Sequence, residues 1–598
     1  MCGIAAIVDL KNSINVEFCL HAMSNCQSHR GPDGSGIFMS SDNKVGLAHK
    51  RLAIVDLTSG GHQPMHDPTR NTHITFNGEI YNFKALRRSL ESAGETFSSD
   101  SDTEVLLKGL SRLGSTFLDQ IDGQFAFVFY NAEINEILAG RDRFGEKPLY
   151  IYNHNSVFAF SSELNALEKL NIPLTFNEGN LQDFLLFQYF TSNRTPYNEV
   201  TKVAPGHYVR ITNDGNLVLN RFDTKLNVES KLIDEELSID DAADKAEEVL
   251  IESLSKRLES SDVEVGAFLS GGIDSSLVVA LATKKLGYKL NTFSIGFDND
   301  PNSEHMVARN ISRIFGTNHI DKIIKLDIQE FISEVLPKMD EPHGDFSNYP
   351  TYELCKVAAQ HVKVAISGDG GDEIFSGYTR YNLPYQKKVA SEKFFSGENY
   401  YSDLILTCDL ADINQLCGGI NEESVHRLET IRQEFDFLKT KIGTLSAMRF
   451  SDIKNYLPGA VLQKVDRMSM LNSLEVRTPF LQAEVFKLGF SLSKSMHIYG
   501  GKSKSILRHL LSRYLDKSIT ELPKKGFGLP SASWGQIEIL TQINRIIKNP
   551  NSPIFNFIDF DRFKFMFSRM SSTDELYKPL FLWNIIVLNY WLANRIRL

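Results

Sequence analysis

Cys2 is the residue whose position points most directly to covalent chemistry. Once Met1 is removed, this residue carries both a thiol and a free α-amine, and a neutral amine can accept the proton of the thiol. A small second residue is compatible with that removal, so we expect Met1 to be cleaved in the cell. Taken alone, Cys2 is better explained as a buried cysteine of a first strand, and it is the neighbouring motifs that favour a nucleophile.

Two glycine-rich segments in the second half of the chain could hold phosphate groups. SGGIDSS (270–276) lies between an expected strand and an expected helix, where free backbone N–H groups form an anion cradle. SGDGGDE (367–373) has the same setting and adds carboxylates. Carboxylates beside a phosphate cradle indicate a cation between them, and Mg²⁺ prefers carboxylate and phosphate oxygens. Neither segment has the GxxxxGK[ST] pattern of a P-loop.

The elements expected before residue 210 are mainly strands. Short β-favouring runs separated by Gly, Asn and Asp occur at 2–10, 46–55, 72–80, 124–130 and 147–152. Two amphipathic helices are expected between them, one from Asn82 to Gly94 and one from after Asp102 to Gly114. This order predicts an α+β domain of packed sheets with helices outside, over residues 1–223.

The pattern changes after a polar, charged stretch at 224–240, which we interpret as a linker. A helix follows at 240–259, and then strands and helices alternate up to about residue 367. Alternation of this kind predicts an α/β domain with a parallel sheet and crossover helices. From about residue 400 the pattern is mostly helical, so the second domain is expected to span residues 241–598.

Composition limits the class of protein. The 598 residues are 42% hydrophobic and 23% charged, a balance typical of globular domains, and on a prior of about 150 residues per domain they allow about two to four domains. The net charge of −10 argues against nucleic acid as the main partner. We find no apolar run of about 18 residues and no signal peptide, and the six cysteines are sparse. We therefore expect a cytoplasmic protein with no membrane partner.

Several motifs of the first half, taken with Cys2, carry a resemblance to a known family. The segments MCGI, HRGPDG, KRLAIVDLTSGGHQPM, FNGEIYNF, SDTEVLL, GQFAFVFY and RDRFGEKPLYI resemble the glutaminase domain of class II glutamine amidotransferases. The version is that of glutamine-hydrolysing asparagine synthetase, and the match runs from residue 2 to about 165. The resemblance implies an Ntn-hydrolase-type sandwich for this domain.

The resemblance also implies roles in glutamine hydrolysis. Cys2 would attack the side-chain amide of glutamine and form a thioester. Asn77, through its side-chain amide, and Gly78, through its backbone N–H, would stabilise the oxyanion. Arg51 would bind the α-carboxylate of glutamine and Asp102 its ammonium, with Glu79 near enough in sequence to help. Asn77-Gly78 alone is equally typical of a hairpin turn, and Asp102 alone of a helix N-cap.

The second half resembles the ATP pyrophosphatases, which make an adenylate and release pyrophosphate. Their SGGxDS loop matches residues 270–275. The implied ATP-binding residues are Leu269, Ser270, Gly271, Gly272, Asp274, Ser275, Ser294, Ser367 and Gly368. The implied Mg²⁺ ligands are Asp274 and Asp372. Further family signatures are YLPGAVLQKVDRMSM, SLEVRTPFL, GGKSKSILR and PKKGFGLP, in the third of which Lys504 would face the transferred phosphates.

Some residues in these signatures have a structural interpretation or depart from the family pattern. Lys464, Asp466, Arg467 and Arg477 are expected to form ion pairs that hold the fold. The family often has YLPDD and PFLDH, whereas this chain has YLPGA and PFLQA. The departures at Gly459, Ala460, Gln482 and Ala483 affect expected contacts near the acceptor, not the ATP chemistry.

The resemblance implies a complete reaction. Glutamine would supply ammonia, ATP with Mg²⁺ would activate aspartate as an acyl-adenylate, and ammonia would displace AMP to give asparagine. The same chemistry on another carboxylate, such as a sugar acid in surface-polysaccharide synthesis, stays open, and a non-catalytic glutamine or nucleotide sensor is a weaker alternative. A β-lactam synthetase-like role is disfavoured because Cys2, Arg51, Asn77 and Asp102 are retained. A homodimer is implied by analogy alone.

Overall fold

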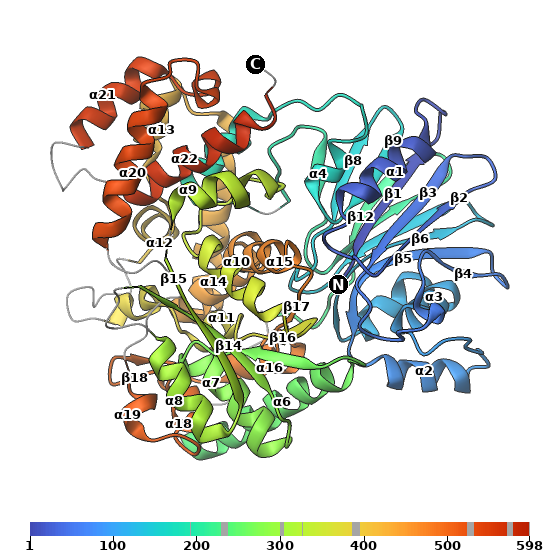
Figure 1. Ribbon diagram of the computed structural model, residues 1–598, viewed down its shortest axis with the longest axis horizontal. Coiled ribbons are helices and arrows are strands. Elements are labelled where there is room, and N and C mark those ends of the chain that lie inside the picture. Colours follow the sequence, from blue (N-terminus) through green and yellow to red (C-terminus); the bar gives the residue numbers. More distant parts are fainter. Residues whose placement is uncertain are drawn as a thin grey trace.

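The computed structural model describes residues 1–191, 193–228, 237–298, 304–325, 327–385, 395–522, 532–570 and 578–596. Its first half contains two six-stranded antiparallel sheets, at the right of Figure 1. The first sheet has the order β10-β8-β9-β1-β3-β2. Its strands are β1 (Gly3–Asp9), β2 (Gly34–Met39), β3 (Val45–Arg51), β8 (Tyr150–His154), β9 (Val157–Ser161) and β10 (Val200–Lys202).

The second sheet packs against the first and has the order β12-β11-β7-β6-β5-β4. Its strands are β4 (Met65–Asp67), β5 (Thr72–Ile80), β6 (Gly123–Asn131), β7 (Glu136–Arg141), β11 (His207–Ile211) and β12 (Leu217–Arg221). The helices of this half are α1 (Val16–Cys26), α2 (Phe83–Ser92), α3 (Asp102–Leu113), α4 (Leu164–Leu167) and α5 (Glu178–Phe187).

The alternation along β1 explains the layering. Ile4, Ala6 and Val8 lie in one core with residues of β6, between the two sheets. Ala5 and Ile7 belong to a different cluster that includes the apolar face of α1. Because neighbouring strand residues point to opposite faces, β1 is buried on both sides. In the second sheet, apolar side chains of β5 pack on α3, on the side away from the first sheet. The domain is therefore a helix–sheet–sheet–helix sandwich, which confirms the predicted fold class.

The second half is built on a five-stranded parallel sheet with the order β15-β14-β13-β16-β17. Its strands are β13 (Val265–Phe268), β14 (Asn291–Phe297), β15 (Asn318–Ile324), β16 (Val364–Ile366) and β17 (Glu475–Arg477). Helices beside it include α6 (Ile239–Glu259), α7 (Ile273–Ala280), α8 (His305–Phe315), α10 (Asn348–Ala358), α11 (Gly371–Phe375), α15 (Leu462–Met470), α16 (Ala483–Ser491) and α18 (Ser505–Leu511). The predicted parallel sheet with crossover helices is confirmed.

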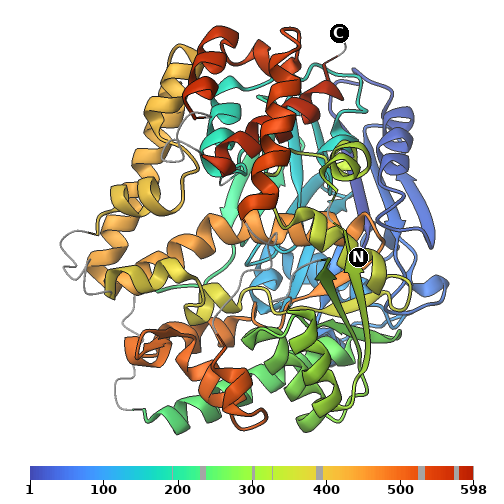
Figure 2. The same ribbon diagram turned by 60° about the vertical axis from the view of Figure 1, so that its left-hand side comes forward.

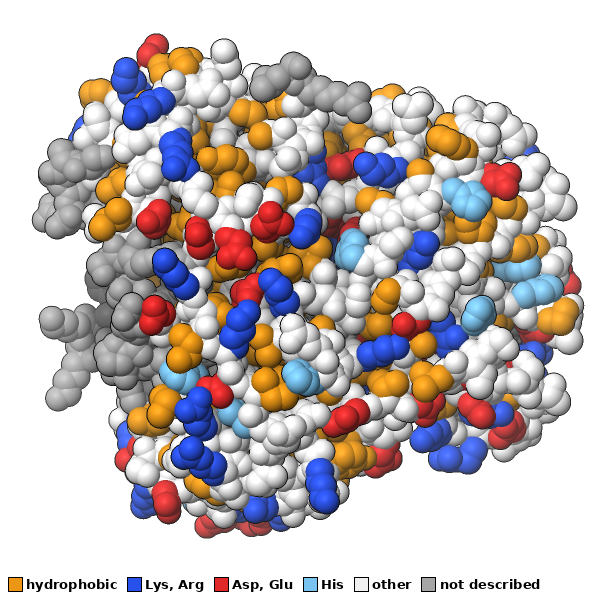
Figure 3. All heavy atoms as spheres, in the orientation of Figure 1, with side chains coloured by type: hydrophobic (Ala, Val, Ile, Leu, Met, Phe, Trp, Pro, Cys, Tyr) orange, Lys and Arg blue, Asp and Glu red, His pale blue; other side chains and the backbone are white. Residues whose placement is uncertain are grey.

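The rest of the described chain is mainly helical, as predicted. These helices are α12 (Gly397–Leu404), α13 (Leu410–Cys417), α14 (Glu422–Lys454), α20 (Ala532–Ile547), α21 (Phe560–Met570) and α22 (Pro579–Ala593). α14 is broken at Gly443, whose φ is +77°, and Figure 2 shows the C-terminal helices gathered above the parallel sheet. In the described part of the chain, none of the helices combines the length and the apolar character that a membrane span requires. Acidic and basic side chains are intermixed on the face shown in Figure 3.

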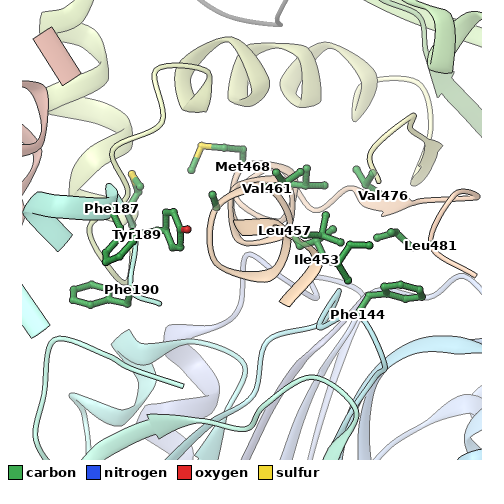
Figure 4. Packing of buried hydrophobic residues seen from close by; sticks show 14 of the residues in the cluster. Phe144, Phe187, Tyr189, Phe190, Ile453, Leu457, Val461, Met468, Val476 and Leu481 are labelled. Carbon is green, nitrogen blue, oxygen red and sulfur yellow. The ribbon is translucent and has the colours of Figure 1, made fainter. Parts of the chain in front are cut away.

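The two halves share one hydrophobic cluster. It contains residues of α1 and α5 together with residues of the parallel sheet and the C-terminal helices. Figure 4 shows part of it, with Phe144 and Tyr189 from the first half beside Leu457 and Leu481 from the second. The N-terminus lies at this junction (Figure 1). Cys2, which directly precedes β1, is therefore next to the second half of the chain. The linker predicted at 224–240 is only partly within the described residues, and the domain limits stay predictions.

Candidate active sites

Cys2 lies directly before β1 and is 8% exposed. Its backbone N–H donates to Oδ1 of Asn77 (2.8 Å), which joins the first sheet to the second. Met1 is present, and its ammonium binds Oε2 of Glu475 on β17 at 2.6 Å. Burial raises the pKa of the Cys2 thiol, and the positive charge of Met1 offsets part of that rise. With Met1 attached, the Cys2 nitrogen is an amide and cannot accept the thiol proton, so removal of Met1 stays a prediction on which the mechanism depends.

Asn77 and Gly78 lie within β5, opposite Ala126 and Phe125 of β6, so the pair forms no hairpin turn. Asn77 is fully buried, and its Nδ2 has no hydrogen-bond partner. Gly78 has φ +151°, and a Cβ added there would meet the carbonyl oxygen of Gln124 at 2.1 Å. An unpaired buried donor costs free energy, so its presence needs an explanation. An oxyanion hole provides one, since it requires an amide donor that is free to bind the negative oxygen of the intermediate.

Replacement of Asn77 by alanine is expected to lower kcat for glutamine hydrolysis by about 10²–10³-fold, with a smaller change in KM. The reason is that the free Nδ2 donor would bind the oxyanion only when negative charge develops on it. Glutamate release under saturating glutamine measures this effect. Asn153→Ala, at an exposed position of β8, is the matched control. A kcat within threefold of the parent value for Asn77→Ala would refute the role.

The structure gives the three predicted glutamine-binding residues different surroundings. Arg51, at the end of β3, donates to the carbonyl oxygens of Thr58 (2.9 Å) and Val55 (3.3 Å), so it holds the loop that follows it. Its contact with substrate stays a prediction. Glu79 is 4% exposed and lies 3.4 Å from the guanidinium of Arg477. Burial raises the pKa of Glu79 well above its ordinary value, although Arg477 acts in the opposite direction.

Asp102 is the first residue of α3, and the preceding Ser101 is the N-cap, since its side chain accepts from the Thr103 N–H. The alternative of Asp102 as the N-cap is therefore wrong. Oδ2 of Asp102 accepts from the Ile80 N–H at 2.9 Å, which fixes the carboxyl beside β5. The residue is 4% exposed, and burial raises its pKa to about 6, against the effect of the backbone hydrogen bonds.

The raised pKa of Asp102 predicts that kcat/KM for glutamine falls on the acidic side of its pH profile. If the ionised carboxylate binds the glutamine ammonium, kcat/KM for glutamine stays high above pH 6 and falls as pH drops through about 6. A Glu or Asp with an ordinary pKa would give a limb near pH 4. The profile of Asp102→Asn is expected to lie much lower and to lack this limb. A limb at pH 6 that survives in Asp102→Asn would assign it to another group.

The first phosphate loop joins β13 to α7, as predicted. Ser270 Oγ lies 3.0 Å from Ser275 Oγ and accepts from the Gly272 N–H (3.2 Å), which holds the turn in shape. Gly271 has φ +85°, a conformation that favours glycine. Leu269 directly follows β13, and Ser294 lies in the middle of β14; their contact with ATP stays a prediction. Ser294 Oγ is 3.1 Å from Nε2 of His319.

The second loop follows β16 and touches the first. A Cβ added at Gly368 would lie 2.9 Å from Cβ of Asp274, so the two loops approach as closely as glycine allows. Lys504 links the two loops, because its ammonium binds Asp274 of the first loop and Asp372 Oδ1 of the second, the latter at 2.5 Å. The residue is 3% exposed, and although burial lowers the pKa of Lys504, the two carboxylates raise it overall. A fixed positive charge therefore faces the phosphate cradle.

The residues around Asp274 and Asp372 fit Mg²⁺. Both carboxylates are hard oxygen donors beside a phosphate loop, and both reach the same cation, the ammonium of Lys504. Among the described residues there is no cluster of three or more His, Cys, Asp or Glu side chains that would hold a metal without substrate. This donor set suits an ion that is completed by phosphate oxygens, and the ligand assignment stays a proposal.

The four residues expected in ion pairs all form them. Lys464 binds Asp345 (3.0 Å), Asp466 binds Arg30 (2.9 Å), Arg467 binds Asp340 (2.6 Å) and Arg477 binds Glu475 (2.6 Å). Asp466–Arg30 joins the two halves of the chain, whereas Lys464–Asp345 lies within the second half beside the nucleotide loop. The PKKGFGLP signature at 523–530 lies outside the described residues.

The departures from the family pattern fall in two places. Gly459 lies against the Tyr189 ring, which a Cβ would meet at 2.5 Å, and Ala460 O is 2.9 Å from Nε2 of His343. Gln482 instead lies near Asp122, at 3.4 Å, and with Ala483 lines a cavity of about 200 Å³ between the halves. Of the two pairs, only Gly459–Ala460 adjoins the segment containing Asp345.

Glu475 is the residue at these sites whose role the motif analysis missed. It lies on β17, is fully buried, and binds both the Met1 ammonium and Arg477. Burial alone would raise the pKa of Glu475, but these two positive charges lower it to about 2. The sequence signal was its place in SLEVRTPFL, since a charged residue in a three-residue buried strand needs partners. One partner, Met1, is 474 positions away in the sequence, and the other, Arg477, lies on the same strand.

A buried cysteine directly before the first strand next to an unpaired buried amide, and two glycine loops linked by one lysine in the same chain, are the arrangement expected of a glutamine amidotransferase fused to an ATP-dependent ligase. Comparisons with known proteins agree. Residues 1–222 match the model of the glutamine amidotransferase domain, and residues 245–593 match that of asparagine synthase. The chain belongs to the family of glutamine-hydrolysing asparagine synthetases, which are ATP-dependent carbon–nitrogen ligases with glutamine as amido donor.

Individual relatives span most of this chain. Asparagine synthetase [glutamine-hydrolyzing] 1 of Bacillus subtilis is 31% identical, over 94% of this chain and 92% of its own length. A putative asparagine synthetase [glutamine-hydrolyzing] 2 of Methanocaldococcus jannaschii is 33% identical, over 80% of this chain and 100% of its own. Among solved structures, glutamine phosphoribosylpyrophosphate amidotransferase from B. subtilis covers 61% of this chain and 81% of its own, with 15% identity and a TM-score of 0.30.

Proposed function

We propose that this protein is a glutamine-dependent asparagine synthetase whose acceptor is aspartate. Glutamine is hydrolysed to glutamate and ammonia in the first half of the chain. In the second half, the side-chain carboxylate of aspartate attacks the α-phosphate of ATP, and pyrophosphate leaves. Ammonia then attacks the acyl-adenylate and displaces AMP, which gives asparagine. The names of the two relatives above support aspartate as the acceptor.

In glutamine hydrolysis the residues of this chain act on one amide group. Cys2, freed of Met1, passes its thiol proton to its own α-amine and attacks the amide carbon. Asn77 Nδ2 and the Gly78 N–H donate to the oxyanion. The leaving nitrogen takes a proton and departs as ammonia, and water then hydrolyses the thioester. Asp102 and Arg51 would orient the substrate through its ammonium and α-carboxylate.

In the second half the residues of this chain hold phosphate and offset charge. The backbone N–H groups of Ser270–Gly272, at the N-terminus of α7, would bind the pyrophosphate. Lys504 would stabilise the negative charge that grows on pyrophosphate as the bond to the α-phosphate breaks. Mg²⁺ bound by Asp274 and Asp372 would neutralise part of the charge on the phosphate oxygens.

The observation that carries the proposal is the contact between the two halves at Cys2. The carbonyl oxygen of Cys2 accepts from Arg30 Nε at 3.0 Å, and Arg30 binds Asp466 on α15 of the second half at 2.9 Å, a link that does not involve Met1. Ammonia released at Cys2 therefore starts at the boundary of the ATP-binding half. Ammonia in neutral water becomes ammonium, which is not a nucleophile, so a dry passage is needed. The apolar residues at the junction in Figure 4 support such a passage.

The test is a single incubation with ATP, Mg²⁺, glutamine and aspartate. Asparagine, AMP and pyrophosphate formed in equal amounts are the expected result. Glutamate formation without asparagine would show that the acceptor is a different carboxylate. Cleavage of ATP to ADP and phosphate would refute the adenylate mechanism. Neither activity in well-folded protein would point to a sensor.

A further inference from the structure

A cavity of about 200 Å³ lies between the two halves of the chain. Asp122, Phe144 and Lys225 of the first half line it together with Leu481 and Gln482 of the second. None of its described lining residues is among those proposed to bind glutamine, ATP or Mg²⁺. At about 30 Å³ for each water molecule, the cavity has room for about six or seven waters, or for one small metabolite.

Lys225 is a cation of this wall without a counter-ion. Its side chain is partly buried, and it forms no ion pair with a described carboxylate. Burial and the neighbouring guanidinium of Arg143 lower the pKa of Lys225, and the carboxylates of Asp119 and Asp122 offset only part of this effect. An anion bound in the cavity would supply the missing negative charge.

Gln482 gives an independent sign that a ligand belongs in the cavity. The residue is 5% exposed, and its Nε2 lies 3.4 Å from Oδ2 of Asp122, which orients the amide. Its Oε1 is then a buried acceptor with no hydrogen-bond partner among the described residues. A buried acceptor without a donor costs free energy unless a bound group supplies that donor.

The acidic residues of the wall already have partners, which limits the ligand to one negative charge. Lys256 binds Asp122 at 3.3 Å and Glu252 at 2.7 Å. Glu484 binds Lys487 at 2.7 Å. A phosphate or a dicarboxylate would bring a second negative charge towards these carboxylates. An ammonium group beside a single carboxylate would instead be attracted to them and could donate to the free amide oxygen.

Another part of the wall is apolar. Ile121, Phe144 and Leu481 line the cavity and are at most 4% exposed, and Figure 4 shows the last two at the junction of the halves. Ala483 also lines the cavity, at the position where the family pattern has the histidine of PFLDH. This chain therefore has the smaller side chain beside the cavity. An aliphatic side chain of a ligand would bury apolar surface here.

We propose that this cavity binds a small apolar α-amino acid of the size of valine, at a site separate from the two reaction centres. Lys225 binds its α-carboxylate, Gln482 Oε1 accepts from its α-ammonium, and its side chain lies against Phe144 and Leu481. Such a molecule has neither the side-chain amide that Cys2 would attack nor the second carboxylate of aspartate, so it is no substrate of the proposed reaction. Because both halves form the wall, the bound amino acid would join them.

Calorimetric titration with L-valine tests this site. One valine is expected to bind to each chain. Isovalerate, which lacks the ammonium, and isobutylamine, which lacks the carboxylate, are each expected to bind at least about 10-fold more weakly. Valine at a hundred times its Kd is expected to raise the midpoint of thermal unfolding by about 2 °C.

Two variants assign the binding to the cavity. Lys225→Met is expected to weaken valine by at least about 10-fold and to leave isobutylamine unchanged, because only the carboxylate loses its partner. Ala483→His places a ring beside the cavity and is expected to abolish binding of valine. Lys11→Met and Ala93→His, at exposed positions outside the cavity wall, are the matched controls. Glutamine hydrolysis is expected to be unchanged in all four variants, which shows that they are folded.

Three results would overturn the inference. The first is the absence of both heat and a midpoint shift at the highest soluble concentration of valine. The second is an affinity for valine that neither Lys225→Met nor Ala483→His changes. The third is tighter binding of phosphate or succinate than of valine, since the site would then be one for dianions. None of these results bears on the proposed function, which the incubation with ATP, glutamine and aspartate tests separately.

Discussion

Replacement of Cys2 by alanine is expected to abolish asparagine formation from glutamine and to leave formation from ammonium nearly unchanged. Loss of the nucleophile removes the thioester route, and in enzymes with a comparable nucleophile the loss in kcat is about 10⁴-fold or more. The second half would still make the adenylate, because none of its phosphate-binding residues contacts Cys2 through an interaction seen in the structure. Rates with glutamine and with ammonium chloride, each with ATP and aspartate, measure the two activities.

The control for this variant is Cys26→Ala on α1, a partly buried cysteine outside the site. It is expected to keep both activities. Equal loss of glutamine-dependent and ammonium-dependent synthesis in Cys2→Ala would contradict independent sites and would point to a structural role for Cys2 at the junction. The structure gives that result a mechanism, since the carbonyl oxygen of Cys2 accepts from Arg30, and Arg30 binds Asp466 of the second half.

The motifs of the chain predicted the fold class because they combine local pattern with chemistry. The strand–loop–helix setting of SGGIDSS followed from a β-favouring run, a glycine turn and a helix-favouring segment, and β13 and α7 flank this loop as expected. The alternation after residue 240 predicted a parallel sheet, and its five strands are parallel. Short-range patterns are enough for such predictions.

Other features of the sites depend on contacts between distant segments and could not be predicted. Asn77-Gly78 has the composition of a turn, but pairing with β6 along nine residues keeps it in a strand. Gln482 was expected near the acceptor, yet it lies beside Asp122 of the first half. Tertiary packing decides each of these cases.

Replacement of Lys504 by methionine is expected to abolish ATP–pyrophosphate exchange, by about 10³-fold or more, while glutamine hydrolysis continues. Methionine keeps the length and the apolar stem of the side chain but removes the charge that faces the cradle. Asp274 and Asp372 would then lose their shared counter-charge, so binding of Mg²⁺–ATP is expected to change less than kcat. Exchange at saturating ATP and aspartate, measured beside glutamate release, separates the two halves of the enzyme.

Lys502→Met is the matched control, because this lysine is two residues away, is 53% exposed and pairs only loosely with Glu521 (3.5 Å). It is expected to keep full exchange. Lys504→Arg is expected to restore little, since the stem is closely confined: a Cβ added at Gly377 would lie 2.1 Å from Cε of Lys504. A larger, planar head group cannot reach both carboxylates in that space. Exchange in Lys504→Met within tenfold of the parent would show that the charge on pyrophosphate is stabilised by other groups, and the backbone cradle at the start of α7 would then be the leading candidate.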